Sequence, residues 1–167
     1  MRLRSLLQPD WNLRKTLPEL PIEELHKRHL KVLILDVDCT LIPHSESRLP
    51  YVMESWLKDA QDHFAIHLFS NNPSNYRIGK LGKELGVSFT TSASKPSSKI
   101  LNKVILEMNL PYRKIALIGD RLFADILTGN QLGLFTILVK PITINRQRDS
   151  YQQLQRIEHQ LSYWIGA

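Results

Sequence analysis

The segment Lys31-Val-Leu-Ile-Leu-Asp-Val-Asp-Cys-Thr-Leu41 decides the fold and points to the function. Its apolar half has the near-continuous hydrophobic character of a strand buried on both faces of a parallel sheet. Side chains two residues apart on an extended segment point the same way, so Asp36 and Asp38 should face one point. In open α/β sheets, ligands bind at the carboxyl edge of the strands. Because close carboxylates repel unless a cation lies between them or they share a proton, this pair predicts a metal-assisted acid and nucleophile.

The composition is that of an ordinary globular protein. The 167 residues suffice for one domain with a real core, and 43% of them are hydrophobic and 23% charged. No apolar run approaches the ~18–20 residues of a spanning helix, and the N-terminus lacks the pattern of a signal peptide. Cys39 is the only cysteine, which excludes an intrachain disulfide and fits a reducing cytoplasm. The net charge of +6 favours anionic partners without choosing among phosphorylated metabolites, nucleic acid and acidic membranes.

Predicted strands and helices alternate along the chain. Strands are expected at 31–36, 65–69, 87–90, 114–118 and 134–139, and helices at 22–28, 51–62, 73–85, 97–108, 122–132 and 149–165. We expect Asn72 to cap the helix that begins at Pro73, and Gly86 to end it. The repeated βαβ units predict a three-layer α/β fold, in which helices cover both faces of a parallel sheet. The chain is interpreted as a single domain over 1–167, with a leader (1–30), a catalytic core (31–139) and a C-terminal amphipathic helix (140–167).

Four motifs follow predicted strands, and each supplies one part of a phosphoryl-transfer site. In the first motif, Asp36 can attack phosphorus to give an acyl phosphate. Asp38 can then protonate the leaving oxygen and later activate water. In the second motif, the hydroxyl of Ser70 and the backbone N–H groups of Asn71 and Asn72 can bind phosphate oxygens.

The third and fourth motifs add charge of both signs. Lys95 can neutralise phosphate charge and restrain the nucleophile. Asp120 and Asp125 follow the strand predicted at 114–118, and hard carboxylate oxygens around an open position suit Mg²⁺. Since the transition state of phosphoryl transfer is stabilised mainly by positioning and charge, these parts suffice for the reaction.

Several of these residues also have a purely structural explanation. Ser70 alone would be an ordinary turn or cap residue. Lys99, one turn after Lys95, is its rival as the functional lysine. Asp120 can simply cap the following helix, and Asp125 can be an exposed helix residue.

At these motifs the chain resembles the haloacid dehalogenase-like (HAD) hydrolase superfamily, over about residues 31–139. The motifs stand in the family's order: Asp36-Val-Asp38-Cys-Thr40, then Ser70, then Lys95, then Gly119-Asp120 to Asp125. The resemblance implies a Rossmann-like sheet with the first strand central, Asp36 as nucleophile and Asp38 as general acid and base. It also implies that Thr40 belongs to the substrate-binding set. The implied Mg²⁺ ligands are Asp36, the Asp38 carbonyl and Asp120, with Asp125 binding directly or supporting the other ligands.

The intervals between motifs leave no room for the cap domains that many superfamily members insert. Only 29 residues (41–69) separate Thr40 from Ser70, and only 24 (71–94) separate Ser70 from Lys95. A capless site is open and suits large substrates such as proteins, nucleic-acid ends or lipids, or it borrows a partner as a lid. The chain resembles the capless subfamily IIIA group related to phosphatidylglycerophosphate phosphatases, and Thr128-Gly129-Asn130 carries much of that likeness. Cys39 departs from the Asn or Gly that this group more often has.

The resemblance therefore implies a Mg²⁺-dependent phosphatase that converts phosphatidylglycerophosphate to phosphatidylglycerol. Soluble phosphomonoesters and phosphoproteins are alternatives within that class. A phosphate-sensing module without turnover is an alternative outside it, although the complete set of Asp36, Asp38, Lys95 and Asp120 argues against a sensor. Nucleic acid is not expected as a partner, and the sequence leaves the oligomeric state open.

Both ends of the chain carry apolar residues beside basic ones. The apolar residues concerned are Leu3, Leu6, Leu7, Trp11, Tyr151, Leu154, Ile157, Leu161 and Trp164. Basic amphipathic segments can lie on an anionic membrane, but an apolar stripe on a terminal helix more often docks on its own sheet. The predicted location is the cytoplasm, with peripheral contact at the inner face of a membrane as the alternative.

Overall fold

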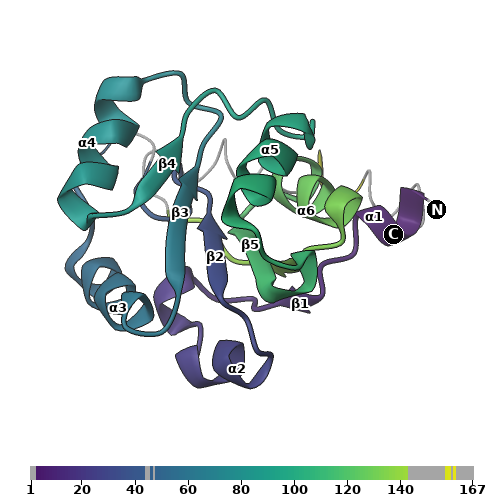
Figure 1. The fold of residues 1–167 in the computed structure, drawn as a ribbon, viewed down its shortest axis with the longest axis horizontal. Helices are drawn as coiled ribbons and strands as arrows, with labels where there is room; N and C mark the ends of the chain where they lie inside the picture. The colour runs from purple at the N-terminus through teal and green to yellow at the C-terminus, as the bar shows by residue number, and fades with distance from the viewer. Residues whose placement is uncertain (1–2, 44–45, 47, 143–156, 159, 161–167) are drawn as a thin grey trace.

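The computed structural model describes residues 3–43, 46, 48–142, 157–158 and 160. Over these residues the chain forms a six-stranded sheet in the order β1-β6-β5-β2-β3-β4 (Figure 1). The strands are β1 (Trp11–Asn12), β2 (Val32–Leu35), β3 (Ala65–Phe69), β4 (Ser88–Thr90), β5 (Ile115–Gly119) and β6 (Phe135–Leu138). Each neighbouring pair is parallel. The predicted parallel sheet is thus confirmed, and β2 lies between β3 and β5 as expected of the first strand of the core.

Helices cover both faces of the sheet, as predicted. The helices are α1 (Leu3–Leu6), α2 (Ile22–Lys27), α3 (Tyr51–Gln61), α4 (Asn75–Leu85), α5 (Lys99–Met108) and α6 (Leu127–Leu132), with short helical turns η1 (Leu17–Glu19), η2 (Tyr112–Lys114) and η3 (Leu122–Ile126). Figure 1 shows α3 and α4 on one side of the strands and α5 and α6 on the other.

Alternation along β2 explains the two cores. Leu33 and Leu35 join a buried cluster with residues of α3 and α4. Val32 and Ile34 join a second cluster with residues of α5. Successive side chains of a strand point to opposite faces, so a strand that is apolar at every position feeds both layers. Each fully buried aliphatic side chain contributes ~1.5–3 kcal/mol to the free energy of unfolding.

The leader contributes a sixth strand that the sequence pattern does not predict. Trp11 and Asn12 pair with Ile137 and Leu138 of β6. Two residues are too short to show a strand periodicity, and long-range contacts hold the leader in place instead. The Asp10 carboxylate accepts hydrogen bonds from the Thr136 backbone N–H at 2.8 Å and from its hydroxyl at 3.1 Å.

The predicted start of α4 is wrong. The helix begins at Asn75, and Ser74 rather than Asn72 caps it by accepting a hydrogen bond from the Arg77 backbone N–H at 3.1 Å. The Asn72 side chain instead accepts from the Ser74 N–H at 2.9 Å, which makes a turn that delays the helix. The predicted stop is correct, because Gly86 takes a left-handed conformation with φ of 66°.

Two further helices differ from their predicted form. The helix expected over 97–108 begins only at Lys99, and the helix expected over 122–132 opens with η3, a wide π-type turn, before α6. Of the C-terminal helix expected over 149–165, residues 157, 158 and 160 are helical and the others lie outside the described residues. None of the helices in the described part of the chain has the length and apolar character needed to cross a membrane.

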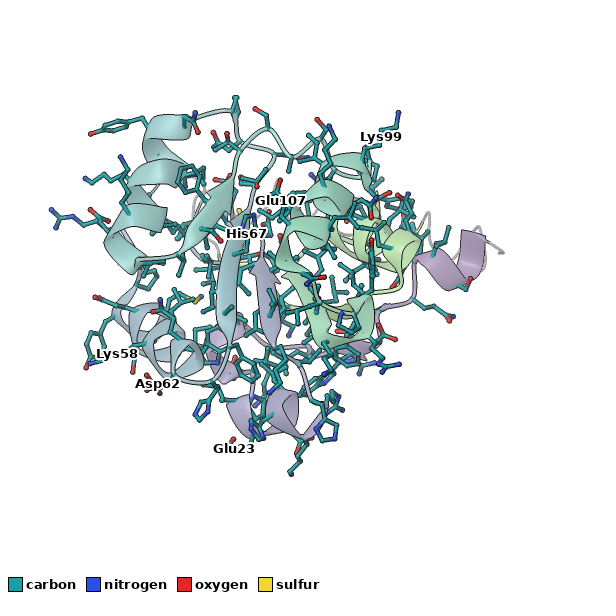
Figure 2. The ribbon with its side chains drawn as sticks, viewed as in Figure 1. Glu23, Lys58, Asp62, His67, Lys99 and Glu107 are labelled. Carbon is teal, nitrogen blue, oxygen red and sulfur yellow. The ribbon has the colours of Figure 1, made fainter. Side chains whose placement is uncertain are left out.

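His67 is a buried titratable group in the middle of β3 (Figure 2). Its ring nitrogens lie 2.8 Å from Ser88 Oγ and 2.9 Å from Thr90 Oγ1. Burial lowers the pKa of His67 from 6.5 to about 4, because the charged imidazolium would lose its hydration. The folded state therefore keeps His67 neutral at pH values at which the unfolded chain already binds a proton.

We predict that this difference makes the folded state less stable as pH falls from about 6.5 to about 4. When the folded-state pKa of a histidine lies below its unfolded-state pKa, the stability is fully present above the unfolded-state pKa and is progressively lost below it. At pH 5, the loss in the free energy of unfolding amounts to about 2 kcal/mol. Urea unfolding at pH 7.5 and pH 5 should show this loss in the wild type and a loss smaller by about that amount in His67→Gln. The exposed His63→Gln is the control. Equal pH dependence in all three proteins would refute the prediction.

Candidate active site

Lys95 lies at the centre of a buried ion network beyond the carboxyl ends of β2 and β5. Its Nζ is 2.5 Å from Asp36 Oδ1 and 2.6 Å from Asp125 Oδ1, and its side chain is 2% exposed. Asp36 directly follows β2, and Asp125 lies in η3. Lys99, the alternative lysine, is exposed and points away from the molecule in Figure 2. The structure therefore brings Lys95 to the predicted carboxylates and leaves Lys99 outside.

Three carboxylates form a compact buried cluster. One oxygen from each of Asp36, Asp120 and Asp125 lies within 4.8 Å of the others. The Lys95 ammonium contacts two of these carboxylates, and all three carboxylates have little access to water. Buried charge of one sign is costly unless it is compensated. The donors are hard oxygens of the kind that Mg²⁺ and Ca²⁺ prefer, so the cluster fits a divalent cation.

Burial and neighbouring charges act on both partners of the Lys95 ion pairs. Burial raises the pKa of Asp36 to about 6, although Lys95 opposes this effect, while the nearby Asp125 charge adds to it. Burial alone would lower the pKa of Lys95, but the carboxylates of Asp125 and Asp36 outweigh it and raise that pKa above its ordinary value. Lys95 is therefore a permanent cation in this network.

Asp125 is held from two sides. Its Oδ1 receives the Lys95 ammonium, and its Oδ2 accepts a hydrogen bond from the Arg121 backbone N–H at 3.1 Å. Asp125 is 1% exposed, so the structure excludes the alternative of an exposed helix residue. Gly119 makes the close approach possible, because a Cβ at that position would lie 2.2 Å from Asp125 Cγ.

Thr40 and Asn71, both predicted to bind substrate, contact other site residues in this structure. The Thr40 hydroxyl donates to Asp120 Oδ1 at 3.2 Å, and Thr40 is fully buried. The Asn71 side chain accepts from the Lys95 N–H at 2.7 Å and donates to the Lys95 carbonyl at 3.0 Å. Both side chains thus orient a charged residue. Their substrate-binding role, which for Asn71 concerns the backbone N–H, stays a prediction.

Asp38 lies apart from the carboxylate cluster, on the β3 side of the site. Its Oδ2 accepts from Ser70 Oγ and from Asn72 Nδ2, each at 3.3 Å. Its Oδ1 is 2.5 Å from Arg77 Nη1. A cavity of about 370 Å³ opens onto Asp36, Asp38 and Lys95, and also onto Ser70, Asn71, Asn72 and Asp125. The predicted nucleophile, acid and phosphate-binding residues therefore share one cavity.

Two charged residues near the site have no sequence signal. Arg77 lies in the first turn of α4, and the sequence pattern does not distinguish it from an ordinary surface arginine. Glu158 is 5% exposed, and its carboxylate accepts from Arg121 Nε at 3.0 Å, Arg121 Nη2 at 2.8 Å and the Leu122 N–H at 3.2 Å. Glu158 thereby contacts the turn that follows Asp120.

Comparisons with known proteins identify the family of this chain. Residues 92–153 match the protein-family model described as HAD-hydrolase-like. The probable phosphatase YqeG of Bacillus subtilis (strain 168) is 30% identical over 141 residues, which cover 84% of this chain and 81% of that protein. The chain belongs to the HAD-like hydrolase superfamily. It is a HAD-type phosphatase, since the relatives that it matches are named as phosphatases.

A second relative and two solved structures extend the comparison. The mitochondrial phosphatidylglycerophosphatase GEP4 of Saccharomyces cerevisiae is 27% identical over 175 aligned positions, covering 97% of this chain and 88% of that protein. A putative HAD superfamily (subfamily III A) hydrolase from Legionella pneumophila matches with a TM-score of 0.54 at 16% identity, over 72% of this chain and 70% of that one. An uncharacterized protein from Listeria monocytogenes serotype 4b gives the same TM-score and identity, over 70% and 84%. The two structures support the fold alone.

We predict that Gly119→Ala displaces Asp125 and weakens the site. The added Cβ has no space unless the Asp125 carboxylate moves, which breaks its bond to Lys95 or to the Arg121 N–H. We expect kcat/KM to fall at least ~10-fold and the free energy of unfolding to fall by about 1–3 kcal/mol, as for other overpacked sites. Gly79→Ala, where the Cβ would meet only the edge of the Phe89 ring at 3.0 Å, is the control for activity. Wild-type kinetics in Gly119→Ala would contradict this account.

We also predict that Lys95→Met destabilises the protein when no cation is supplied. The variant leaves Asp36 and Asp125 buried without their ammonium partner, and breaking a buried pair in this way costs about 3–5 kcal/mol. Urea unfolding in EDTA measures the loss, with the exposed Lys99→Met as the matched control. A Lys95→Met protein as stable as Lys99→Met would show that the network does not depend on this charge.

Proposed function

We propose that this phosphatase hydrolyses a phosphomonoester through an aspartyl phosphate on Asp36, with Mg²⁺ as its cofactor. The observation that carries the proposal is the position of the Asp36 carboxylate. It lines the cavity, contacts the Lys95 ammonium and belongs to the three-carboxylate cluster. A carboxylate that is held by a fixed cation and faces a cavity is placed to act as a nucleophile.

In the first step, a carboxylate oxygen of Asp36 attacks phosphorus and the bond from phosphorus to the ester oxygen breaks. The carboxyl group of Asp38 gives its proton to that leaving oxygen. In the second step, water attacks the aspartyl phosphate while the Asp38 carboxylate accepts its proton. The bond between phosphorus and Asp36 then breaks, which releases inorganic phosphate and restores both carboxyl groups to their starting forms.

The residues around this pair supply positioning and charge. Ser70 and the backbone N–H groups of Asn71 and Asn72 bind phosphate oxygens, and Lys95 holds Asp36 in line. Asp36, Asp120 and Asp125, with the Asp38 carbonyl, would hold Mg²⁺, which when bound neutralises the charge of the transferring phosphoryl group. The compact arrangement of three buried carboxylates supports a cation at this place.

We further propose that the substrate is phosphatidylglycerophosphate, which would make the product phosphatidylglycerol. Between Thr40 and Ser70, and between Ser70 and Lys95, the described residues form α3, α4, β3, β4 and connecting loops, without a domain to enclose the cavity. An open cavity suits a headgroup presented by a lipid surface, and GEP4 is named for that lipid activity. The proposed location is the cytoplasm, with peripheral contact at an anionic membrane.

The deciding experiment measures phosphate release from phosphatidylglycerophosphate in mixed micelles and from soluble phosphomonoesters and a phosphopeptide. Each substrate is tested with Mg²⁺ and with EDTA. We expect turnover of the lipid that requires the cation. Fast turnover of a soluble substrate without any of the lipid would overturn the lipid assignment, and turnover unaffected by EDTA would overturn the metal assignment. A protein that hydrolyses none of them would leave the sensor alternative.

Asp36→Asn should abolish this activity, by at least ~10³-fold, because an amide oxygen cannot form the phosphoenzyme. The fold should persist, since the change removes one buried negative charge. Asp62→Asn, at the outer end of α3 in Figure 2, is the matched control. Wild-type turnover in Asp36→Asn would refute the nucleophile assignment.

A further inference from the structure

Arg77 reaches Asp38 from a fixed place on α4. The two side chains are 19% and 20% exposed, and Arg77 Nη1 lies 2.5 Å from Asp38 Oδ1. The Arg77 backbone N–H donates to the Ser74 hydroxyl that caps the helix. The ion pair is therefore partly shielded from water, unlike an exposed surface pair. The helix cap fixes the backbone position from which the Arg77 side chain extends.

The other side of the guanidinium is also engaged. Arg77 Nη2 donates to the Glu46 carbonyl at 3.1 Å, and Nε lies 3.4 Å from the same oxygen. Because the guanidinium is planar, contacts on one edge fix the direction of the other. The guanidinium of Arg77 thus directs Nη1 at Asp38 and connects Asp38 with Glu46, in the loop that follows the first motif.

The contacts of Arg77, Ser70 and Asn72 with the two oxygens of Asp38 differ in length. Oδ1 has the short contact with Arg77, whereas Oδ2 accepts from Ser70 and Asn72 at 3.3 Å, a long distance for a hydrogen bond. Asp38, Ser70 and Asn72 line the cavity, but Arg77 is not among its lining residues. Arg77 therefore reaches a substrate through Asp38 rather than by direct contact.

We propose that Arg77 is the positioning residue of Asp38 in the phosphatase reaction. Arg77 holds Oδ1 in place. When a phosphate group binds Ser70 and Asn72, Oδ2 gives up its contacts with these two residues and turns towards the leaving oxygen. This inference rests on the proposed function, because it assigns to Asp38 the proton transfer described there. It has a specific consequence, since help from a general acid matters most when the leaving group is a strongly basic alkoxide.

The test compares two phosphomonoesters with different leaving groups, in the full chain with Mg²⁺. For Arg77→Ala, we expect kcat/KM to fall about 10- to 100-fold with an alkyl phosphate, which is phosphatidylglycerophosphate or the best alkyl substrate found, the loss expected when a general acid is misplaced. With p-nitrophenyl phosphate, whose leaving group needs little protonation, we expect a fall of less than about 3-fold. Arg77→Lys should recover part of the alkyl activity, because an ammonium keeps the charge but not the planar contacts.

Lys80→Ala is the matched control, since Lys80 is an exposed cation on the same helix and pairs with Glu84. It should match the wild type with both substrates. The inhibition constant of inorganic phosphate is measured in parallel, and Arg77→Ala should leave it within about 3-fold of the wild type, as expected of a residue without direct phosphate contact.

Equal losses with both substrates would overturn the positioning role and point to general structural damage. A weaker inorganic phosphate inhibition in Arg77→Ala, with equal losses, would assign Arg77 to the phosphate itself. An unaltered Arg77→Ala would remove it from the site. Absence of turnover in the wild type would overturn the proposed function and this inference together, whereas the other outcomes bear on Arg77 alone.

Discussion

A lysine buried between two carboxylates is the constraint on which this site depends. Taking such ions out of water costs several kcal/mol each, and only well-held partners recover that cost. The surrounding contacts serve this requirement. Asn71 holds the Lys95 backbone on both sides, and the Arg121 N–H holds Asp125. Gly119 leaves space that any side chain would fill. The network is thus set by backbone contacts before any substrate arrives, which is the preorganisation that phosphoryl transfer needs.

The parallel sheet brings distant parts of the sequence to this network. β2, β3 and β5 are neighbours that run in the same direction, so Asp36, Ser70 and Asp120, each the first residue after its strand, meet at one edge. The helices on both faces bury the strands and leave that edge to the loops. Stability therefore depends on the apolar residues within the strands. The proposed chemistry depends on the polar residues just beyond the ends of the same strands.

Prediction from the sequence succeeded where a residue follows a strong apolar run. Asp36, Ser70 and Asp120 lie at the predicted edge of the sheet, because the strand fixes the direction of the next residue, while their roles stay predictions. The pairing of Lys95 with Asp125 depends on a loop and on the wide turn of η3, which the helical pattern of 122–132 does not reveal. Arg77 contacts Asp38 across 39 positions and Glu158 contacts Arg121 across 37, and no local sequence pattern predicts either contact. A two-residue strand such as β1 has no periodicity that a sequence pattern could reveal. Ser74 rather than Asn72 caps α4, because the Asn72 side chain closes a local turn instead.

The outer strands of the sheet have a consequence for association between molecules. β1 has two residues and β4 has three, so the sheet ends in very short edges on both sides. Long, flat edges with unpaired N–H and C=O groups are templates for pairing with another chain, and short ones are a common protection against it. Among the described residues, growth of this sheet by edge-to-edge pairing is therefore disfavoured.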